Sequence, residues 1–352
     1  MEIFKKRVRK FQDLLKKNEI DGTVIRTLST YTYFTGVRWL RPALLLPSHG
    51  EPIAIVVKGE EELFREKSWI ENIMTYRKAE DLMAIVTKWI RSNGYKKVGL
   101  EFSVERDSYI LFLEVFKKLN PNIEIIDIRN LSMELRMIKD DWEIENIKKA
   151  GKLASKAMEV ASDEIEIGKS ELEIASEIYK YLMMHGSEEP KIYVSATPRI
   201  HAEPFRDVKV RDGKFVTIVI GADFNHYYAN IGRSFFIGRK NERVKNAINA
   251  IEIAHKIAME NTLPRKKFIE VEREIESIYK KMDLQDYYIT GYAHGVGLLI
   301  EEDPITTILV RQRTMEVLNG MVLAMVHSPL MIPEGAVKKE DTIIIGKEIV
   351  TK

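Results

Sequence analysis

The sequence predicts an α+β protein built from two domains, and three observations support this prediction. The chain has 352 residues, which is longer than most single domains. Its hydrophobic content of 45% is sufficient for sizeable cores. In the first 130 residues, short apolar strands alternate with helices, which indicates a mixed sheet with helices on its faces. We therefore expect an N-terminal mixed α/β domain over residues 1–130 and a second domain over residues 131–352.

The first domain is expected to open with an amphipathic helix, because Phe4, Val8, Phe11 and Leu15 fall on one side of it. Turn residues such as Gly36 and Gly50 separate the elements that follow. Strands are expected at residues 23–25, 43–46, 52–57, 97–100 and 123–126, and helices at residues 29–35, 60–67, 79–92 and 105–119.

The second domain is expected to begin with a helix over residues 131–162 that is broken near residues 139–141, where Asp140 or Asp141 can cap the second part. Ser170 and Glu173 match a capping box, which predicts the start of the next helix. Further helices are expected at residues 241–261 and 267–282, and strands at residues 192–195, 308–311, 321–326, 342–345 and within 292–302.

Residues 214–236 predict a β-hairpin, around which the second domain is organised. β-Branched and aromatic residues form two runs, 215–220 and 227–231, on either side of a polar turn at residues 223–226. With Phe224-Asn225 as the loop, Val219 lies directly opposite Asn230 on the same face of the hairpin.

Composition and charge exclude several classes of protein. The chain has no cysteine, so disulfides and thiolate metal sites are excluded. A net charge of +2 without a basic stripe argues against a nucleic-acid partner. No signal peptide and no apolar run long enough for a membrane helix is evident, so we expect a cytoplasmic protein. Scarce glutamine with abundant Lys, Glu and Ile is typical of a thermophile.

Several motifs, taken in order, resemble one known family. They are Tyr33-Phe34-Thr35-Gly36 with Arg41-Pro42, residues 135–140 (LRMIKD), residues 293–298 (AHGVGL) and residues 320–322 (GMV). The chain resembles the creatinase, prolidase and methionine aminopeptidase family over nearly its whole length. The resemblance implies a C-terminal domain of the pita-bread fold, a prolidase-like N-terminal domain and a homodimer.

The resemblance also implies a two-metal site with five ligands, Asp, Asp, His, Glu and Glu. These ligands fall at Val219, Asn230, His294, Val326 and Glu340, so three of the five are lost and only His294 and Glu340 are kept. Two hard cations about 3–4 Å apart need several carboxylates to offset their repulsion. We therefore expect no bound metal and no cofactor, and a former site closed by an apolar plug of buried valines.

Two further positions follow from the resemblance. A family histidine falls at Glu301, and the loop histidine that precedes the hairpin is similar to His201. We expect a binding pocket formed by His201, Asn230, His294, Glu301 and Glu340, with His201, His294 and Glu340 as catalytic remnants.

Two functions from different classes stay open. The first is a catalytically inactive homologue of Xaa-Pro dipeptidase that binds a peptide, a protein or a small molecule. The alternative is a hydrolase, either a residual Xaa-Pro dipeptidase or a metal-free enzyme similar to creatinase. In the metal-free case His201 would act as the base and Glu301 and Glu340 as substrate-binding carboxylates.

Each candidate also has an ordinary structural interpretation. His294 is expected to be a buried histidine bonded to backbone. Residues 301–303 read as a solvated acidic run, and residues 338–340 read as a surface turn. At the hairpin tip, turn chemistry accounts for Asp223 and Asn225, and His226 is expected to be solvated.

Overall fold

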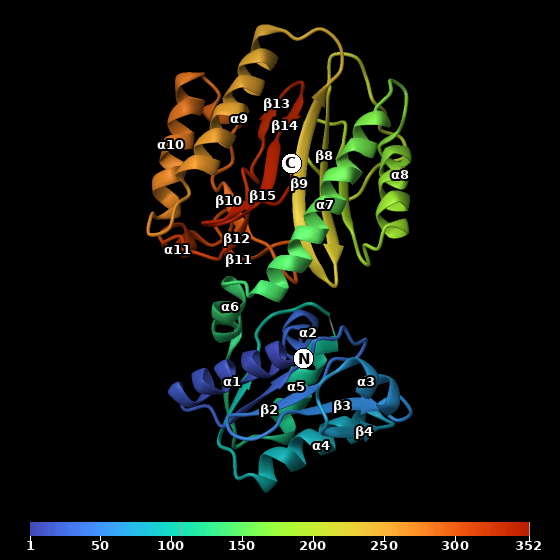
Figure 1. Ribbon diagram of the computed structural model, residues 1–352, viewed down its shortest axis with the longest axis vertical. Coiled ribbons are helices and arrows are strands. Elements are labelled where there is room, and N and C mark those ends of the chain that lie inside the picture. Colours follow the sequence, from blue (N-terminus) through green and yellow to red (C-terminus); the bar gives the residue numbers. More distant parts are fainter. Residues whose placement is uncertain (107, 352) are drawn as a thin grey trace. The chain divides into compact units, whose positions relative to one another are not determined.

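The computed structural model describes residues 1–106 and 108–351 and divides into two compact units, Met1–Arg136 and Met137–Lys352 (Figure 1). The division lies a little later than the boundary expected at residue 130, because helix α6 (Arg129–Met137) falls almost wholly in the first unit. No helix in the part of the chain that the structure describes is both long and apolar enough to cross a bilayer.

The N-terminal unit is a six-stranded sheet in the order β4-β3-β2-β1-β5-β6. Strand β2 is antiparallel to β1 and β3, whereas β1, β3, β4, β5 and β6 all run in one direction. The strands are β1 (Gly22–Ile25), β2 (Leu44–Pro47), β3 (Ile53–Val57), β4 (Ile73–Tyr76), β5 (Lys97–Leu100) and β6 (Glu124–Asp127). The helices are α1 (Glu2–Lys17), α2 (Leu28–Thr35), α3 (Glu61–Lys67), α4 (Ala79–Ser92) and α5 (Ser108–Leu119).

The C-terminal unit is built on an eight-stranded sheet in the order β11-β10-β12-β15-β9-β8-β7, with β16 paired to β15. Its strands are β7 (Lys191–Ser195), β8 (Phe215–Phe224), β9 (Tyr227–Phe236), β10 (Ala293–Gly295), β11 (Glu302–Ile305), β12 (Val322–Met325), β15 (Lys339–Ile344) and β16 (Glu348–Ile349), with a separate pair β13 (Leu330–Ile332) and β14 (Gly335–Val337). Its helices are α7 (Asp141–Asp163), α8 (Glu171–Met184), α9 (Glu242–Asn261), α10 (Phe268–Lys281), the short α11 (Val310–Arg313) and the 3₁₀ turn η1 (Gln285–Tyr287).

Side-chain alternation along the strands gives the eight-stranded sheet two different faces. Ile218 and Ile220 of β8 and Ile231 of β9 pack in a core with residues of α7 and α8, and α7 lies over these two strands in Figure 1. Leu323 and Ile343 pack in a second core with α9 and α10. The intervening residues, which include Val219, Asn230, His294 and Glu340, therefore lie on the face that these helices leave uncovered.

The register of the central hairpin differs from the prediction. Strand β8 pairs with β9 so that Gly221, not Val219, lies opposite Asn230, and Val219 lies opposite Gly232. The loop is Asn225-His226, and both residues have positive φ, 48° and 69°. This backbone is typical of a type I′ turn, which matches the twist of the two strands and shifts the register by two residues. Because side chains alternate with a period of two, Val219 and Asn230 still share a face.

Replacing Asn225 with alanine is expected to lower the free energy of unfolding by about 1–2 kcal/mol, because alanine is disfavoured in the left-handed region. The change also removes the hydrogen bond from Asn225 Nδ2 to Asn146 Oδ1, 2.8 Å long. Asn225→Gly removes the same hydrogen bond but permits positive φ, so urea unfolding of the two variants separates the two contributions. Equal losses in both variants would contradict a backbone requirement at this turn.

One other element prediction is wrong, and two further pieces of strand structure were not predicted. Residues 308–311, predicted as a strand, lead into α11, whose Gln312 side chain accepts a hydrogen bond from the Ile305 backbone. Strand β4 was not predicted; three of its four residues are half-buried and one is exposed, with no clear alternation. The β13–β14 pair was also not predicted, and its strands have only three residues each.

Candidate functional site

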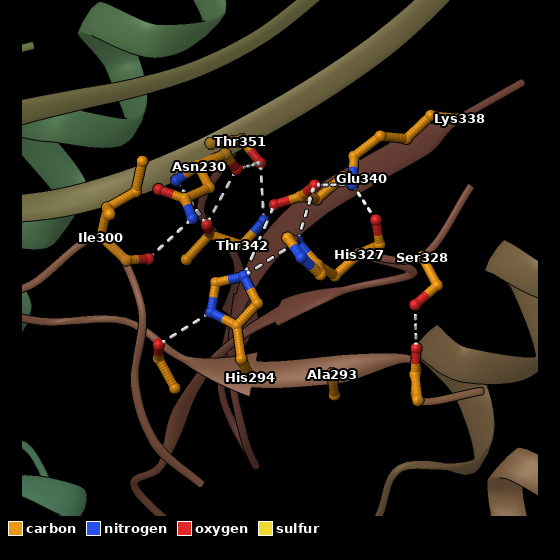
Figure 2. Close-up of polar contacts among 12 residues, drawn as sticks. Asn230, Ala293, His294, Ile300, His327, Ser328, Lys338, Glu340, Thr342 and Thr351 are labelled. Carbon is orange, nitrogen blue, oxygen red and sulfur yellow. Dashed lines mark hydrogen bonds and ion pairs between the residues drawn. The ribbon is translucent and has the colours of Figure 1, made fainter. Parts of the chain in front are cut away.

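A cavity of about 490 Å³ opens on the uncovered face of the eight-stranded sheet. All five residues predicted to form a binding pocket, His201, Asn230, His294, Glu301 and Glu340, line this cavity. Strands β9, β10 and β15 supply Asn230, His294 and Glu340, and neighbouring loops supply the other two. Figure 2 shows Asn230, His294 and Glu340 together with His327 and Lys338, two residues that were not predicted.

His294 and His327 contact each other at the base of the cavity. Their rings are nearly perpendicular, with centroids 4.5 Å apart, and His294 Nε2 lies 3.2 Å from His327 Nδ1. The other nitrogen of His294, Nδ1, donates to the Gly295 carbonyl at 2.9 Å. Burial lowers the pKa of His294 to about 4, and His327 adds to this effect. Burial also lowers the pKa of His327, and Lys338 acts in the same direction. Both imidazoles are therefore neutral at pH 7.

Lys338 and Glu340 form a buried ion pair beside these histidines. The Lys338 ammonium lies 2.6 Å from Glu340 Oε2, and the two side chains are 2% and 0% exposed. Lys338 also donates to the His327 carbonyl. Burial raises the pKa of Glu340, but Lys338 and the two histidines outweigh burial and hold that pKa well below its usual range. Glu340 makes no well-angled hydrogen bond to the described residues, so its charge is stabilised mainly by the ammonium.

Besides the Glu340 carboxylate, two acceptor oxygens in the cavity lack a donor among the described residues. The Asn230 amide donates from Nδ2 to the Ile300 carbonyl at 2.9 Å, which leaves its Oδ1 buried and without a hydrogen bond. Glu301 is half-buried, and its Oε1 is likewise buried without a partner. Buried acceptors without donors are rare and costly in native proteins. These two oxygens therefore indicate a place for a ligand that donates hydrogen bonds.

His201 lies at the cavity but does not reach Glu301 or Glu340. Its Nε2 lies 3.2 Å from Glu171 Oε1, and its Nδ1 lies 2.6 Å from the Glu203 carbonyl. Both ring nitrogens face acceptors, so only the doubly protonated ring can donate to both. Both ring nitrogens are thus engaged with Glu171 and the Glu203 carbonyl rather than with the two predicted carboxylates. The structure thus does not place His201 as a general base.

The expected apolar plug is wrong. Val219 and Val326 are both buried, at 7% and 1% exposure, but they do not close the site. Val219 forms part of the cavity wall, whereas Val326 packs in the core with α9 and α10. Val326 has a φ of 59°, which is exceptional for a β-branched residue and interrupts the alternation that β12 sets up. His327, the next residue, consequently lines the cavity instead.

The residues present do not fit the two-metal site that the resemblance implies. Val219 and Val326 carry no ligand atom, and the Asn230 amide offers one neutral oxygen. The Lys338 ammonium also brings positive charge to Glu340, which is one of the two retained ligand positions. A different and smaller set of ligands is present, however. His294, Glu301 and His327 place one ligand atom each within 4.8 Å of one another.

The acidic run at residues 301–303 and the turn at residues 338–340 were expected at the surface, but the structure buries most of their side chains. Glu302 pairs with Lys139 at 2.8 Å, and each side chain is 1% exposed. Asp303 is also buried, which leaves only Glu301 of this run to face the cavity. Lys338 and Glu340 are buried at β15 rather than exposed in a turn.

The hairpin tip has a structural role that its sequence only partly indicated. Asp223 is fully buried and accepts hydrogen bonds from the backbone N–H groups of Glu188 and Glu189 and from the Ser187 hydroxyl. His226 is half-buried rather than solvated, with Nδ1 2.5 Å from Glu188. This group of side chains holds the loop that precedes β7 against the hairpin.

Comparisons with known proteins agree with this architecture. A family model described as metallopeptidase family M24 matches residues 145–347, and one described as the creatinase/prolidase N-terminal domain matches residues 7–138. The Xaa-Pro dipeptidase of Pyrococcus horikoshii is 28% identical over 99% of this chain and 96% of its own length. The Xaa-Pro dipeptidase of Pyrococcus furiosus is 29% identical over 97% of this chain and 95% of its own length.

Solved structures show the same similarity. The crystal structure of the Pyrococcus horikoshii prolidase matches with a TM-score of 0.88 at 28% identity, covering 99% of this chain and 98% of that one. The Pyrococcus furiosus prolidase matches with a TM-score of 0.86 at 27% identity, covering 97% of this chain and 99% of that one. The matches confirm the expected fold class, a mixed α/β N-terminal domain followed by a pita-bread domain. The chain belongs to metallopeptidase family M24 and is related to the Xaa-Pro dipeptidases.

Proposed function

We propose that this protein binds short peptides with a free amino end in the cavity and does not cleave them with a pair of metal ions. The observation that carries the proposal is the ion pair of Lys338 with Glu340, which supplies a fixed positive charge to a retained ligand position. Because the Lys338 ammonium is part of the chain, the negative charge of Glu340 is balanced without a metal ion. The peptide class follows from the family and from the dipeptidases to which the chain is similar.

The orientation of the peptide follows from the unpaired acceptors. An ammonium group carries three N–H donors and a positive charge, which suits the Glu301 carboxylate and the Asn230 amide oxygen. Apolar side chains, among them Tyr193, Ile300 and Met331, complete the wall and suit an apolar residue of the peptide.

Calorimetric titration of the metal-free protein with glycyl-proline tests the proposal. Glu301→Gln is expected to weaken binding at least tenfold, which is about 1.4 kcal/mol. Glu316→Gln is the control, because it removes the same charge at an exposed position. It is expected to leave the affinity unaltered. N-acetyl-glycyl-proline, which lacks the ammonium, is expected to bind wild type as weakly as the free dipeptide binds Glu301→Gln. Equal affinity for both peptides would overturn the proposed orientation.

Titration with Co²⁺, Mn²⁺ and Zn²⁺, with a dipeptide cleavage assay on the same samples, tests the catalytic part. We expect no stoichiometric binding of two ions and no cleavage. Two bound ions together with cleavage of glycyl-proline would overturn the proposal and identify a conventional metallopeptidase.

A hydrolase with one metal ion is a second candidate, and the grouping of His294, Glu301 and His327 favours it. Two histidines and one carboxylate are a ligand set of catalytic zinc sites that keep an open position. This candidate predicts that one Zn²⁺ binds per chain. His327→Ala is then expected to abolish both Zn²⁺ binding and peptide cleavage. Absence of stoichiometric Zn²⁺ binding by the wild-type protein would exclude this candidate.

A further inference from the structure

A second cavity, of about 580 Å³, lies wholly within the N-terminal unit and is rich in arginine. Arg26, Arg41 and Arg106 line it together with Tyr76 and Tyr109, and none of the described lining residues is acidic. Arg41 and Arg106 are exposed, whereas Arg26 is half-buried. The cavity therefore has two arginines at the exposed part of its lining and a third at a more enclosed position.

The topology of the sheet explains why these residues meet. The carboxyl ends of the parallel strands β1, β3, β4, β5 and β6 share one edge of the sheet. Arg26 directly follows β1, and Tyr76 ends β4. Successive strands extend from β1 to β4 on one side, and the chain then returns to place β5 on the other side of β1. In open α/β sheets this reversal point, at the carboxyl ends of the strands, is where ligands bind.

Arg26 has hydrogen-bond donors that the described residues leave unused. Its Nε and Nη1 are buried without a hydrogen-bond partner, while the guanidinium stacks over the Phe112 ring at 5.1 Å. Burial lowers the pKa of Arg26, and Arg106 acts in the same direction, so the charge sits in an unfavourable place. Burying a charged donor without an acceptor is costly, and an anion would remove that cost.

The other two arginines are only partly neutralised. Arg41 lies 3.7 Å from Glu60, and Arg106 donates to the Leu40 carbonyl, which carries no charge. The described lining residues thus supply three guanidinium groups and no carboxylate, and Glu60 is the described carboxylate that pairs with Arg41. A phosphate monoester carries about −1.5 to −2 at pH 7 and presents several oxygens to arginine forks.

We propose that this cavity binds a small phosphate-bearing molecule, with Arg26 as the residue that contacts the phosphate. The site is separate from the peptide cavity and does not depend on the function proposed for that cavity. The ligand is either free phosphate or pyrophosphate or a phosphorylated small molecule, whose apolar part Leu82 and Pro42 can contact.

Calorimetric titration of the full chain with inorganic phosphate, pyrophosphate and AMP tests the proposal. We expect binding that weakens with added salt, as ionic contacts do. Arg26→Met is expected to weaken it at least tenfold, and Arg26→Lys, which keeps the charge without the fork, to weaken it less. Arg9→Met, at an exposed arginine of α1, is the matched control and is expected to leave binding unchanged. Tighter binding of AMP than of phosphate would assign a phosphorylated small molecule, and equal binding would assign the free anion.

The melting temperature of the ligand-free variants separates a binding role from a structural one. Arg26→Met removes a guanidinium whose buried Nε and Nη1 have no acceptor among the described residues, so the melting temperature of this variant is expected to equal or exceed that of the wild type. Failure of all three anions to bind the wild-type protein would overturn the proposal. A lower melting temperature of Arg26→Met with unchanged anion affinity would overturn it as well and assign Arg26 a purely structural role.

Discussion

Replacing Lys338 with methionine is expected to lower the free energy of unfolding by about 3–5 kcal/mol, because removing one member of a buried ion pair leaves the other charge uncompensated. Lys338 is 3% exposed, and its ammonium lies 2.6 Å from the fully buried Glu340. Methionine keeps most of the volume but removes the charge and the donor to the His327 carbonyl. Urea unfolding at pH 7 measures the loss.

A double-mutant cycle shows whether the ion pair causes this loss. Glu340→Gln alone is expected to destabilise the protein, since the ammonium then lacks its partner, whereas the double variant K338M/E340Q is expected to lose less than the sum of the two single losses. Lys339→Met is the matched control, because Lys339 is partly exposed and pairs with Glu252 on the surface, where ion pairs contribute about 0–1 kcal/mol. Additive losses, or a comparable loss in Lys339→Met, would show that the buried pair is not the cause.

That two of the expected ligand positions cannot ligate a metal could be predicted from the sequence, because it is a question of residue type. Valine at positions 219 and 326 has no ligand atom in any conformation. Which side chains line the cavity at these positions depends on backbone geometry instead. The positive φ of Val326 directs that side chain to the core and leaves His327 to line the cavity, and no motif marks this change. A histidine directly after a lost ligand position was the one available signal.

Lys338 illustrates why charge patterns mislead at such a site. Two lysines followed by Glu340 and Asp341 look like a solvated turn, and Lys339 is indeed partly exposed. Strand alternation from Lys339 onward places Glu340 on the cavity face, and burial of Glu340 then requires a positive charge. The N-terminal arginines escaped notice for a related reason. Arg26, Arg41 and Arg106 are far apart in the sequence and meet because the carboxyl ends of the parallel strands lie at the same edge of the sheet as the amino end of the antiparallel β2.

The stability of the protein is expected to fall as the pH drops below about 6.5, and His294 is expected to cause a large part of this fall. His294 is 1% exposed, and burial lowers its pKa from 6.5 to about 4. Below pH 6.5 the unfolded chain binds a proton at this residue, whereas the folded protein does not until about pH 4. The unfolded state is therefore stabilised relative to the folded state as pH falls, by 1.36 kcal/mol per pKa unit, which amounts to roughly 3 kcal/mol over the whole window. The lowered pKa of His327 acts in the same direction.

The range from pH 6.5 to 5 separates the histidines from the carboxylates whose pKa values are lowered. Glu340 and Glu334 have lowered pKa values, so their stabilisation is fully present above about pH 4.5 and is lost only below it. Urea unfolding in chelator-treated buffer is expected to show a loss of about 2 kcal/mol across this range for His294 alone. His294→Gln is expected to reduce the slope by that amount, whereas His185→Gln, at an exposed histidine, is expected to keep it. An unchanged slope in His294→Gln would show that this imidazole takes up its proton in the folded protein, which would require a less buried site than the one described.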